Sequence, residues 1–384
     1  MTVHLSREAT LVLRSARITP DPEWHALCAQ PLRWQEVIAV AADERAASVL
    51  SRRLPPNTPD DARAALRRFA LVAEFRHAQL EQLYKTTLAD LASAGRDAVL
   101  LKGGALMARG IATAAERPMS DLDLLLPPDQ AQNTWEQLQD CGWRWDRERF
   151  PAPLYERQHH LPPLVDAGGS SYRLEVHRDL FPPFHPFALS ADDVRRASTT
   201  VQSNETPIRV PDSTHLLVHS AIHFAWAHTL ESKAWRTLRD VELLTTRTEV
   251  DWSELVDTAL QVRAGSCTYW TLRLAQSVIG TPIPHDVLER LKPPRSDATL
   301  RRLERHYARN MLLTPSRCPS DRMRRVFWEA GICPKHQGHG TARPWDGTFR
   351  IPEVQQWDEG RGTMGVSDRL RQTGRLARYV WELR

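Results

Sequence analysis

Residues 117–126 read Arg-Pro-Met-Ser-Asp-Leu-Asp-Leu-Leu-Leu, and this stretch decides the fold. Successive side chains of an extended strand point to opposite faces. Asp121 and Asp123 therefore share one face, and the alternate leucines share the other. The stretch predicts a strand that presents two carboxylates to a cation and buries its leucines in a core.

A glycine pair lies upstream of this strand, in Leu101-Lys102-Gly103-Gly104. Glycines that open a helix let backbone amides approach a phosphate, and the helix N-terminus adds partial positive charge. We therefore predict phosphate contacts for Gly103 and Gly104. Lys102 is one of only five lysines in the chain, so we predict a phosphate contact for it as well, with an ordinary strand-end cation as the alternative.

A third carboxylate follows in residues 172–177, Tyr-Arg-Leu-Glu-Val-His, which alternate with the period of a strand. Glu175 shares its face with His177, for which a structural hydrogen bond is the simpler reading. Carboxylates on neighbouring strands can hold the hard divalent cations that compensate phosphate charge in nucleotidyl transfer. We predict that Asp121, Asp123 and Glu175 bind Mg²⁺, with Mn²⁺ as the alternative, and that Glu175 either ligates metal or acts as a base.

Composition excludes several classes of protein. The 51 basic and 47 acidic residues leave a net charge of +4, which does not favour a nucleic-acid partner. The five cysteines are scattered without CxxC spacing, so they indicate neither a zinc site nor a disulfide framework. No segment reaches the roughly 20 apolar residues that span a bilayer. These features predict a cytoplasmic protein without a membrane partner.

Patterning along the 384 residues predicts an α+β protein in four parts. Residues 1–94 have the spacing of helices, including a long one that ends near residue 93. Residues 95–211 mix strands and helices and form the catalytic core. Residues 212–314 are a helical C-terminal lobe. Residues 315–384, rich in Arg, Pro and Gly, are expected to form a largely irregular extension.

The glycine pair, the aspartate strand and the Glu175 strand resemble the uncharacterised nucleotidyltransferase family of the DNA polymerase β-like superfamily, over about residues 95–245. The resemblance implies a small mixed sheet flanked by helices, a two-metal mechanism and a nucleoside triphosphate donor. In that family the helical lobe carries a histidine-rich helix and then a basic residue before an aspartate. Four residues match this loosely: His219, His223, Arg236 and Asp240.

The chain departs from the superfamily pattern at the glycine pair, where alanine follows Gly104 in place of serine. Ser120 is the candidate replacement for that phosphate-contacting hydroxyl. Arg117 is read either as a phosphate ligand or as the residue that fixes the aspartate loop.

Charges on the helical lobe allow two readings each. Lys233, Arg236 and Asp240 either reach the nucleotide or lie on a solvated helix face. His215, His219 and His223 share one helix face, for which packing against the core is favoured over a metal site.

These observations predict an enzyme that transfers a nucleoside monophosphate to a hydroxyl acceptor, with release of pyrophosphate. The acceptor is a small metabolite, a natural product, a peptide or a protein. One alternative is a catalytically inert nucleotide-binding regulatory or scaffold protein. Others are a tRNA-modifying nucleotidyltransferase and a DxD glycosyltransferase, the latter weakened by the lack of a Rossmann glycine fingerprint.

Overall fold

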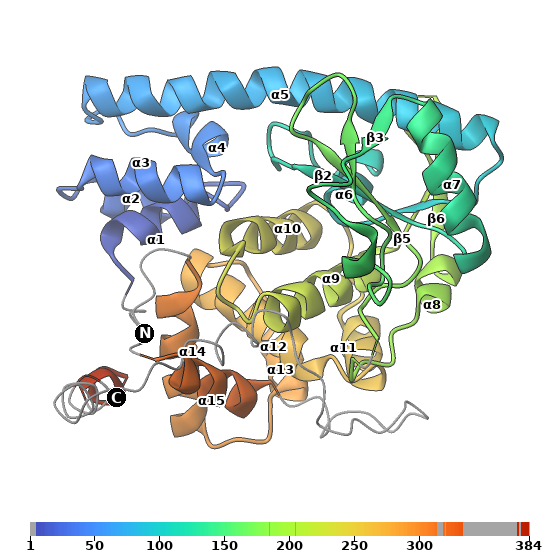
Figure 1. Ribbon diagram of the computed structural model, residues 1–384. Helices are drawn as coiled ribbons and strands as arrows, with labels where there is room; N and C mark the ends of the chain where they lie inside the picture. Colours follow the sequence, from blue (N-terminus) through green and yellow to red (C-terminus); the bar gives the residue numbers. More distant parts are fainter. Residues whose placement is uncertain are drawn as a thin grey trace, which may run out of the picture.

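The computed structural model places a seven-stranded sheet between a group of N-terminal helices and a group of C-terminal helices (Figure 1). The structure describes residues 5–183, 185–203, 205–312, 318, 320–332, 375 and 378–383. Buried apolar residues from all three groups form one continuous cluster. The predicted α+β class is confirmed, whereas the predicted domain boundaries remain predictions.

The N-terminal helices include one that is far longer than the others. The elements are α1 (Arg7–Arg14), α2 (Pro22–Cys28), α3 (Trp34–Asp43), α4 (Ala47–Ser51) and α5 (Asp60–Ser93). Helix α5 has 34 residues and ends before Gly95, whose φ of +61° stops the helix. In Figure 1 it runs along the top of the molecule, from the N-terminal helices to the sheet. The long helix predicted to end near residue 93 is thus present.

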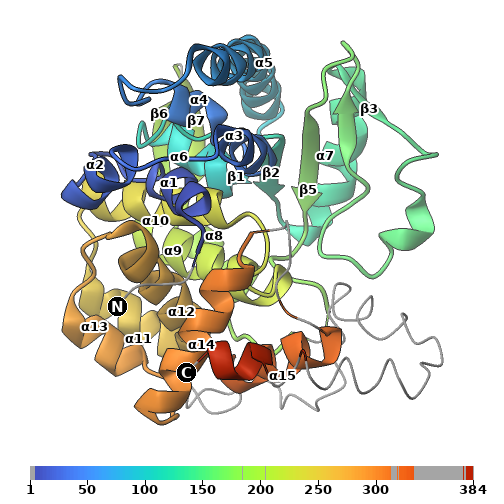
Figure 2. The same ribbon diagram turned by 90° about the vertical axis from the view of Figure 1, so that its left-hand side faces the viewer.

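The sheet has the strand order β3-β4-β5-β2-β1-β7-β6. Its strands are β1 (Val99–Leu100), β2 (Asp121–Leu125), β3 (Trp143–Trp145), β4 (Leu164–Asp166), β5 (Arg173–His177), β6 (Thr199–Ser203) and β7 (Thr206–Val210). The central strand β2 pairs parallel with β5 and antiparallel with β1. Leu122 and Leu124 are buried, as the strand alternation predicts. Figure 2 shows β5 beside β3 and α7 at one side of the molecule.

Short helices connect the strands. They are α6 (Lys102–Ala108), α7 (Pro128–Asp140), a 3₁₀ turn (Ala152–Leu154) and α8 (Ala191–Arg196). Helix α6 follows β1 directly and packs against β2, so its N-terminus lies next to the aspartate strand. The connection from α6 to β2 carries Arg117, which reaches the C-terminal helices.

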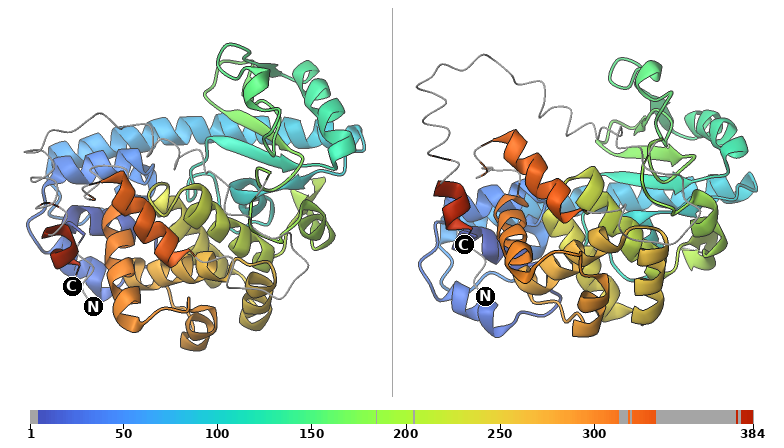
Figure 3. Two further views of the ribbon diagram at one scale, coloured as in Figure 1. Left: turned by 60° about the horizontal axis from the view of Figure 1, so that its bottom comes forward. Right: turned by 90° about the horizontal axis from the view of Figure 1, so that it is seen from below.

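The C-terminal helices cover the opposite side of the sheet from α5, as the views from below show (Figure 3). They are α9 (Ser213–Ile222), a π-helix (His223–Ala227), α10 (Ala234–Arg247), α11 (Trp252–Gln261), α12 (Gly265–Leu274), a second π-helix (Ala275–Ile279), α13 (His285–Leu291), α14 (Asp297–Asn310) and α15 (Asp321–Gly331). None of the helices within the described residues combines the length and the apolarity needed to cross a membrane.

Helix α15 corrects the expectation of an irregular chain beyond residue 315. It forms because Ser320 caps it and because Trp328 has a docking place: the indole donates to the Ala225 carbonyl at 2.7 Å, and its ring lies 4.9 Å from that of Trp226. Most of the predicted extension, residues 333–374, lies outside the described residues.

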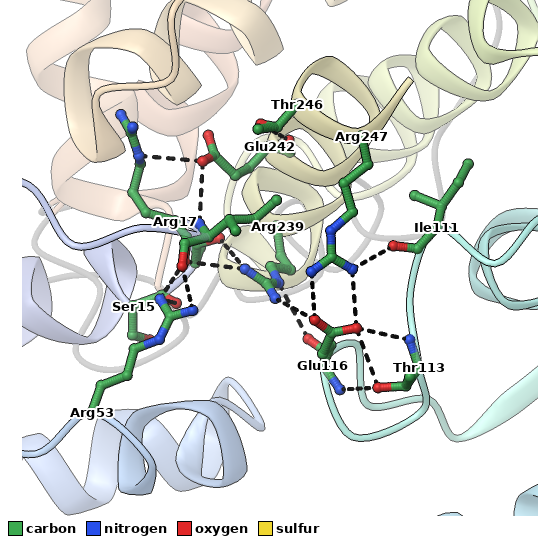
Figure 4. A network of polar contacts seen from close by, with 12 residues as sticks. Ser15, Arg17, Arg53, Ile111, Thr113, Glu116, Arg239, Glu242, Thr246 and Arg247 are labelled. Atoms are coloured by element: carbon green, nitrogen blue, oxygen red, sulfur yellow. Dashed lines mark hydrogen bonds and ion pairs between the residues drawn. The ribbon is translucent and has the colours of Figure 1, made fainter. Parts of the chain in front are cut away.

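A network of arginines joins the three groups of elements (Figure 4). Arg239 of α10 donates to the carbonyls of Ala16, at 2.9 Å, and Glu116, at 3.2 Å. Arg247 of α10 pairs with the Glu116 carboxylate at 2.6 Å. The Arg247 hydrogen bond is the main reason that the pKa of Glu116 falls to about 2. The loop that precedes β2 is thereby fixed to α10 and to the N-terminal helices.

Glu44, the residue after α3, reaches the start of α10. Its carboxylate accepts the backbone N–H of Trp235 at 3.0 Å, which satisfies one of the amides that a helix leaves unpaired at its N-terminus. The side chain is buried, and this burial raises the pKa of Glu44 to about 7. The N-terminal helices therefore help to hold the end of α10 that carries Lys233 and Arg236.

We predict that Glu44→Gln stabilises the protein at alkaline pH. The folded-state pKa near 7 lies above the ordinary 4.5, so the folded state binds more protons and the wild type loses stability as pH rises through this window. The amide oxygen of glutamine can still accept the Trp235 N–H. Urea unfolding should give a variant more stable by up to about 3 kcal/mol at pH 8 and by less than about 1 kcal/mol at pH 5. A variant that is less stable than the wild type at pH 8 would refute this.

Candidate active site

The parallel pairing of β2 and β5 brings two of the predicted carboxylates together. Asp123 lies opposite Glu175 in the register, and Asp121 lies opposite Arg173. The Asp123 side chain is only 3% exposed, whereas the Asp121 side chain is 21% exposed. Arg173 Nη2 lies 3.7 Å from Asp121 Oδ2. The two aspartates share a strand face but occupy different electrostatic surroundings.

Asp123 is compensated by two cationic groups on the same oxygen. Lys102 Nζ lies 2.6 Å from Asp123 Oδ1, and His177 Nε2 donates to that oxygen at 3.0 Å. Burial alone would raise the pKa of Asp123, but Lys102 and His177 outweigh burial and hold it well below its ordinary value. The carboxylate is therefore ionised despite its burial.

Glu175 and His177 complete this group. Glu175 Oε2 lies 3.7 Å from His177 Nε2. Burial raises the pKa of Glu175, yet the His177 hydrogen bond and Lys102 bring it down to about 2. Asp123, Glu175 and His177 each offer one ligand atom, and these atoms lie within 4.8 Å of one another. This set could hold a divalent cation, and Asp121 does not belong to it.

The start of α6 brings Lys102 into the site with a strained backbone. Lys102 has a φ of +49°, a conformation that residues other than glycine rarely adopt. A Cβ at Gly103 would lie 2.2 Å from Met119 Sδ and 2.7 Å from Arg117 Nη1. Gly103 is thus required for the close approach of the loop before β2. The missing Cβ of Gly104 faces the buried Leu100 instead.

One pocket connects the two sides of the site. It is lined by Lys102, Gly103, Leu106, Arg117, Asp121, Asp123, Leu216, His219, Ser220, His223, Lys233, Arg236, Thr237, Asp240 and Leu244. Eight of the residues predicted from the sequence are among these, whereas Gly104, Ser120 and Glu175 are not. The pocket joins the aspartate strand and α6 to the facing helices α9 and α10.

Lys233 and Arg236, at the start of α10, give the pocket its positive wall. Within the described part of the chain, neither has a carboxylate within ion-pair distance, although both are partly buried. Burial and the neighbouring Arg236 lower the pKa of Lys233 to about 8. Burial and Arg117 lower the pKa of Arg236 to about 10. Lys233 also has a positive φ, of +57°. Two partly buried cations without a counter-ion favour an anionic ligand.

Arg117 and Asp240 form a buried pair across the pocket. Arg117 Nε and Nη2 donate to the two carboxylate oxygens of Asp240, each at 2.8 Å. Burial lowers the pKa of Arg117, but Asp240 more than offsets this and leaves it raised. This bidentate geometry fixes the aspartate loop to α10. This contact agrees with the reading of Arg117 as the residue that fixes the loop, and Arg117 also lines the pocket.

Histidines form a second layer of the site. His219 and His223 line the pocket, and burial lowers the pKa of His219 to about 3, so its ring is neutral. His215 instead pairs with Asp212 at 2.9 Å. His223 is the first residue of the π-helix that follows α9.

Sequence reasoning missed His159 and His160, whose rings lie 5.1 and 5.3 Å from the His177 ring. The adjacent histidine pair in residues 158–163, Gln-His-His-Leu-Pro-Pro, was the available signal. It sits in a loop without periodicity, which reaches β5 through the bridge from His160 to His177 and through Arg178, whose guanidinium donates to the Gln158 carbonyl.

A comparison with known families identifies the family of the chain. Residues 30–280 match the family described as "Uncharacterised nucleotidyltransferase". No curated protein and no solved structure matches the chain. The family match covers well over half of the chain, including the strands and helices that form the pocket. The chain therefore belongs to the family of uncharacterised nucleotidyltransferases.

Proposed function

We propose that this protein transfers a nucleoside monophosphate from a nucleoside triphosphate to a hydroxyl acceptor, with a divalent cation, Mg²⁺ or Mn²⁺, and with release of pyrophosphate. One observation carries the proposal. Asp123, which lies in register with Glu175 on the neighbouring strand, lines a pocket whose facing wall holds the unpaired cations Lys233 and Arg236.

The positive wall suits a triphosphate. A polyphosphate would supply the negative charge that Lys233 and Arg236 lack, and arginine can bind two phosphate oxygens at once. Lys102 lies on the other side of the pocket, with its ammonium between Asp123 and the open space. These three residues are the proposed triphosphate ligands. Asp240 holds Arg117, so we assign Arg117 to positioning.

The donor set fits a divalent cation. Asp123 and Glu175 are ionised, as metal ligation requires, and their oxygens lie within 4.8 Å of each other. Asp121 lines the same pocket and can contact a cation that is bound to the nucleotide. Such a cation would neutralise charge on the α-phosphate and on departing pyrophosphate.

In the proposed reaction the acceptor oxygen forms a bond to the α-phosphorus, and the bond between this phosphorus and the bridging oxygen breaks. Lys233 and Arg236 stabilise the charge on departing pyrophosphate. With a pKa near 2, Glu175 is a weak base, which favours ligation over proton removal.

Catalysis should depend on both aspartates. We expect Asp123→Asn and Asp121→Asn each to lower nucleotidyl transfer at least about 100-fold, because each removes a carboxylate that contacts the cation that neutralises phosphate charge. The assay incubates the protein with Mg²⁺ or Mn²⁺, each labelled triphosphate and a panel of metabolites, peptides, proteins and tRNA. Pyrophosphate release and label transfer are measured.

Asp140→Asn is the matched control, since Asp140 is exposed at the end of α7. If wild type, Asp121→Asn and Asp123→Asn bind and turn over nucleotide alike, the proposal is wrong. Triphosphate binding without pyrophosphate release under every acceptor would instead identify an inert nucleotide-binding protein. Turnover of nucleotide sugars alone would identify a glycosyltransferase.

Lys233 and Arg236, the unpaired cations, should lower the stability of the fold while they support triphosphate binding. We expect Lys233→Met to weaken triphosphate binding at least about tenfold and to raise the free energy of unfolding by about 1 to 2 kcal/mol at pH 7. Its pKa near 8 lies below the ordinary 10.5, so the stability cost is complete below pH 8 and is lost as pH rises toward 10.5. The gain in stability should therefore shrink at pH 9.5.

Calorimetry with a nucleoside triphosphate and urea unfolding give the two readouts. Lys85→Met, at an exposed lysine of α5, serves as the control and should change neither quantity appreciably. A Lys233→Met variant that loses stability and keeps full nucleotide affinity would assign Lys233 a structural role.

A further inference from the structure

We propose that the cation of this site is held by His177 together with Asp123 and Glu175, and that this mixed nitrogen and oxygen donor set selects a transition cation such as Mn²⁺ over Mg²⁺. The role of this cation in catalysis rests on the proposed function, whereas the ligand set is inferred from the structure alone. It replaces Asp121 by His177 in the ligand set that the sequence suggested.

The geometry singles out these three residues. Among the described residues, Asp123, Glu175 and His177 are the group of three potential ligands whose donor atoms lie within 4.8 Å of one another. His177 Nε2 is 3.0 Å from Asp123 Oδ1 and 3.7 Å from Glu175 Oε2, so it points between the two carboxylates. The His177 side chain is 1% exposed, and the strand β5 fixes its position.

Asp121 lies outside this arrangement for a structural reason. It is at the first position of β2, two residues before Asp123, and its carboxylate lies 3.7 Å from Arg173 Nη2. The parallel register instead places the end of β5, with Glu175 and His177, beside Asp123. A cation bound between the strands therefore meets Asp123, Glu175 and His177.

The donor types determine which cation is preferred. Mg²⁺ takes oxygen ligands almost exclusively, with strict octahedral geometry, whereas an imidazole nitrogen suits first-row transition cations. Ligation uses the lone pair of His177 Nε2, so the hydrogen that this atom donates to Asp123 leaves to solvent. The two carboxylates and the neutral imidazole then form a three-ligand set.

Lys102 competes with the cation for Asp123. Its ammonium contacts the same oxygen, Oδ1, at 2.6 Å, and a divalent cation on this oxygen would repel it. Lys102 lines the triphosphate pocket, so an ammonium displaced from Asp123 has phosphates as its alternative partner. Cation binding and triphosphate binding should therefore support each other through Lys102.

The test measures cation binding to the full-length protein without nucleotide. Mn²⁺ binding is followed by the loss of the free Mn²⁺ paramagnetic resonance signal, and Mg²⁺ binding by competition with Mn²⁺. We expect Mn²⁺ to bind at least about tenfold more tightly than Mg²⁺. Pulsed resonance on bound Mn²⁺ should show coupling to an imidazole nitrogen. His177→Asn should abolish this coupling and weaken Mn²⁺ binding about 10- to 100-fold.

Two further variants test the inference even if His177→Asn fails to fold. Lys102→Met should tighten Mn²⁺ binding several-fold, because it removes the competing ammonium. Asp121→Asn should leave Mn²⁺ affinity without nucleotide within about twofold of the wild type. His77→Asn, at a buried histidine of α5, is the control for placing an amide in the interior.

Absence of nitrogen coupling in the wild type, or equal affinity for Mg²⁺ and Mn²⁺, would overturn the inference. So would a loss of Mn²⁺ binding in Asp121→Asn. These outcomes are distinct from a failure of the proposed function. Nucleotidyl transfer that survives in His177→Asn leaves the proposed function intact, whereas Mn²⁺ binding through His177 without any transfer contradicts the proposed function alone.

Discussion

The charge on Asp123 is the constraint on which the site depends. A carboxylate that is 3% exposed is stable only when cations or hydrogen-bond donors compensate it, and here both compensating groups meet on one oxygen. Lys102 arrives from the start of α6, and His177 from the end of β5. Asp123 is therefore compensated only when β5 pairs correctly with β2 and when α6 begins beside β2. The same ion cluster depends on both conditions.

Local sequence patterns predicted the parts of the site that depend on local geometry. The alternation of β2 and β5 follows from strand pleating, and the end of α5 follows from Ala94 and Gly95. Gly103 shows where local reasoning stops, because a phosphate cradle and a close approach to Met119 both call for glycine. Arg117 itself had two readings in the sequence, and neither named Asp240 as its partner. Asp240 lies 123 residues further along the chain, and the packing of α10 brings the two side chains together.

The remaining features arise from long-range packing that no local pattern records. Glu44 caps α10 from 191 residues away, and the His159–His160 loop reaches β5 through the bridge from His160 to His177. The positive φ of Lys102 is equally invisible in a sequence that reads as a strand followed by a helix. Such exceptions to local rules concentrate where a protein trades stability for a ligand site.

This trade explains the rigid surroundings of α10. Burial lowers the pKa values of Lys233 and Arg236, and repulsion adds to this: Arg236 repels Lys233, and Arg117 repels Arg236. The start of a helix is also electrostatically unfavourable for cations, because its dipole is positive there. Three anchors oppose this tendency of the helix end to move away: Glu44 at its N-terminus, the Arg117–Asp240 pair at its middle and the arginine network at Arg239 and Arg247. The anchors keep Lys233 and Arg236 opposite Asp123 despite the repulsion between these cations. A polyanion bound between the two walls of the pocket would relieve this repulsion.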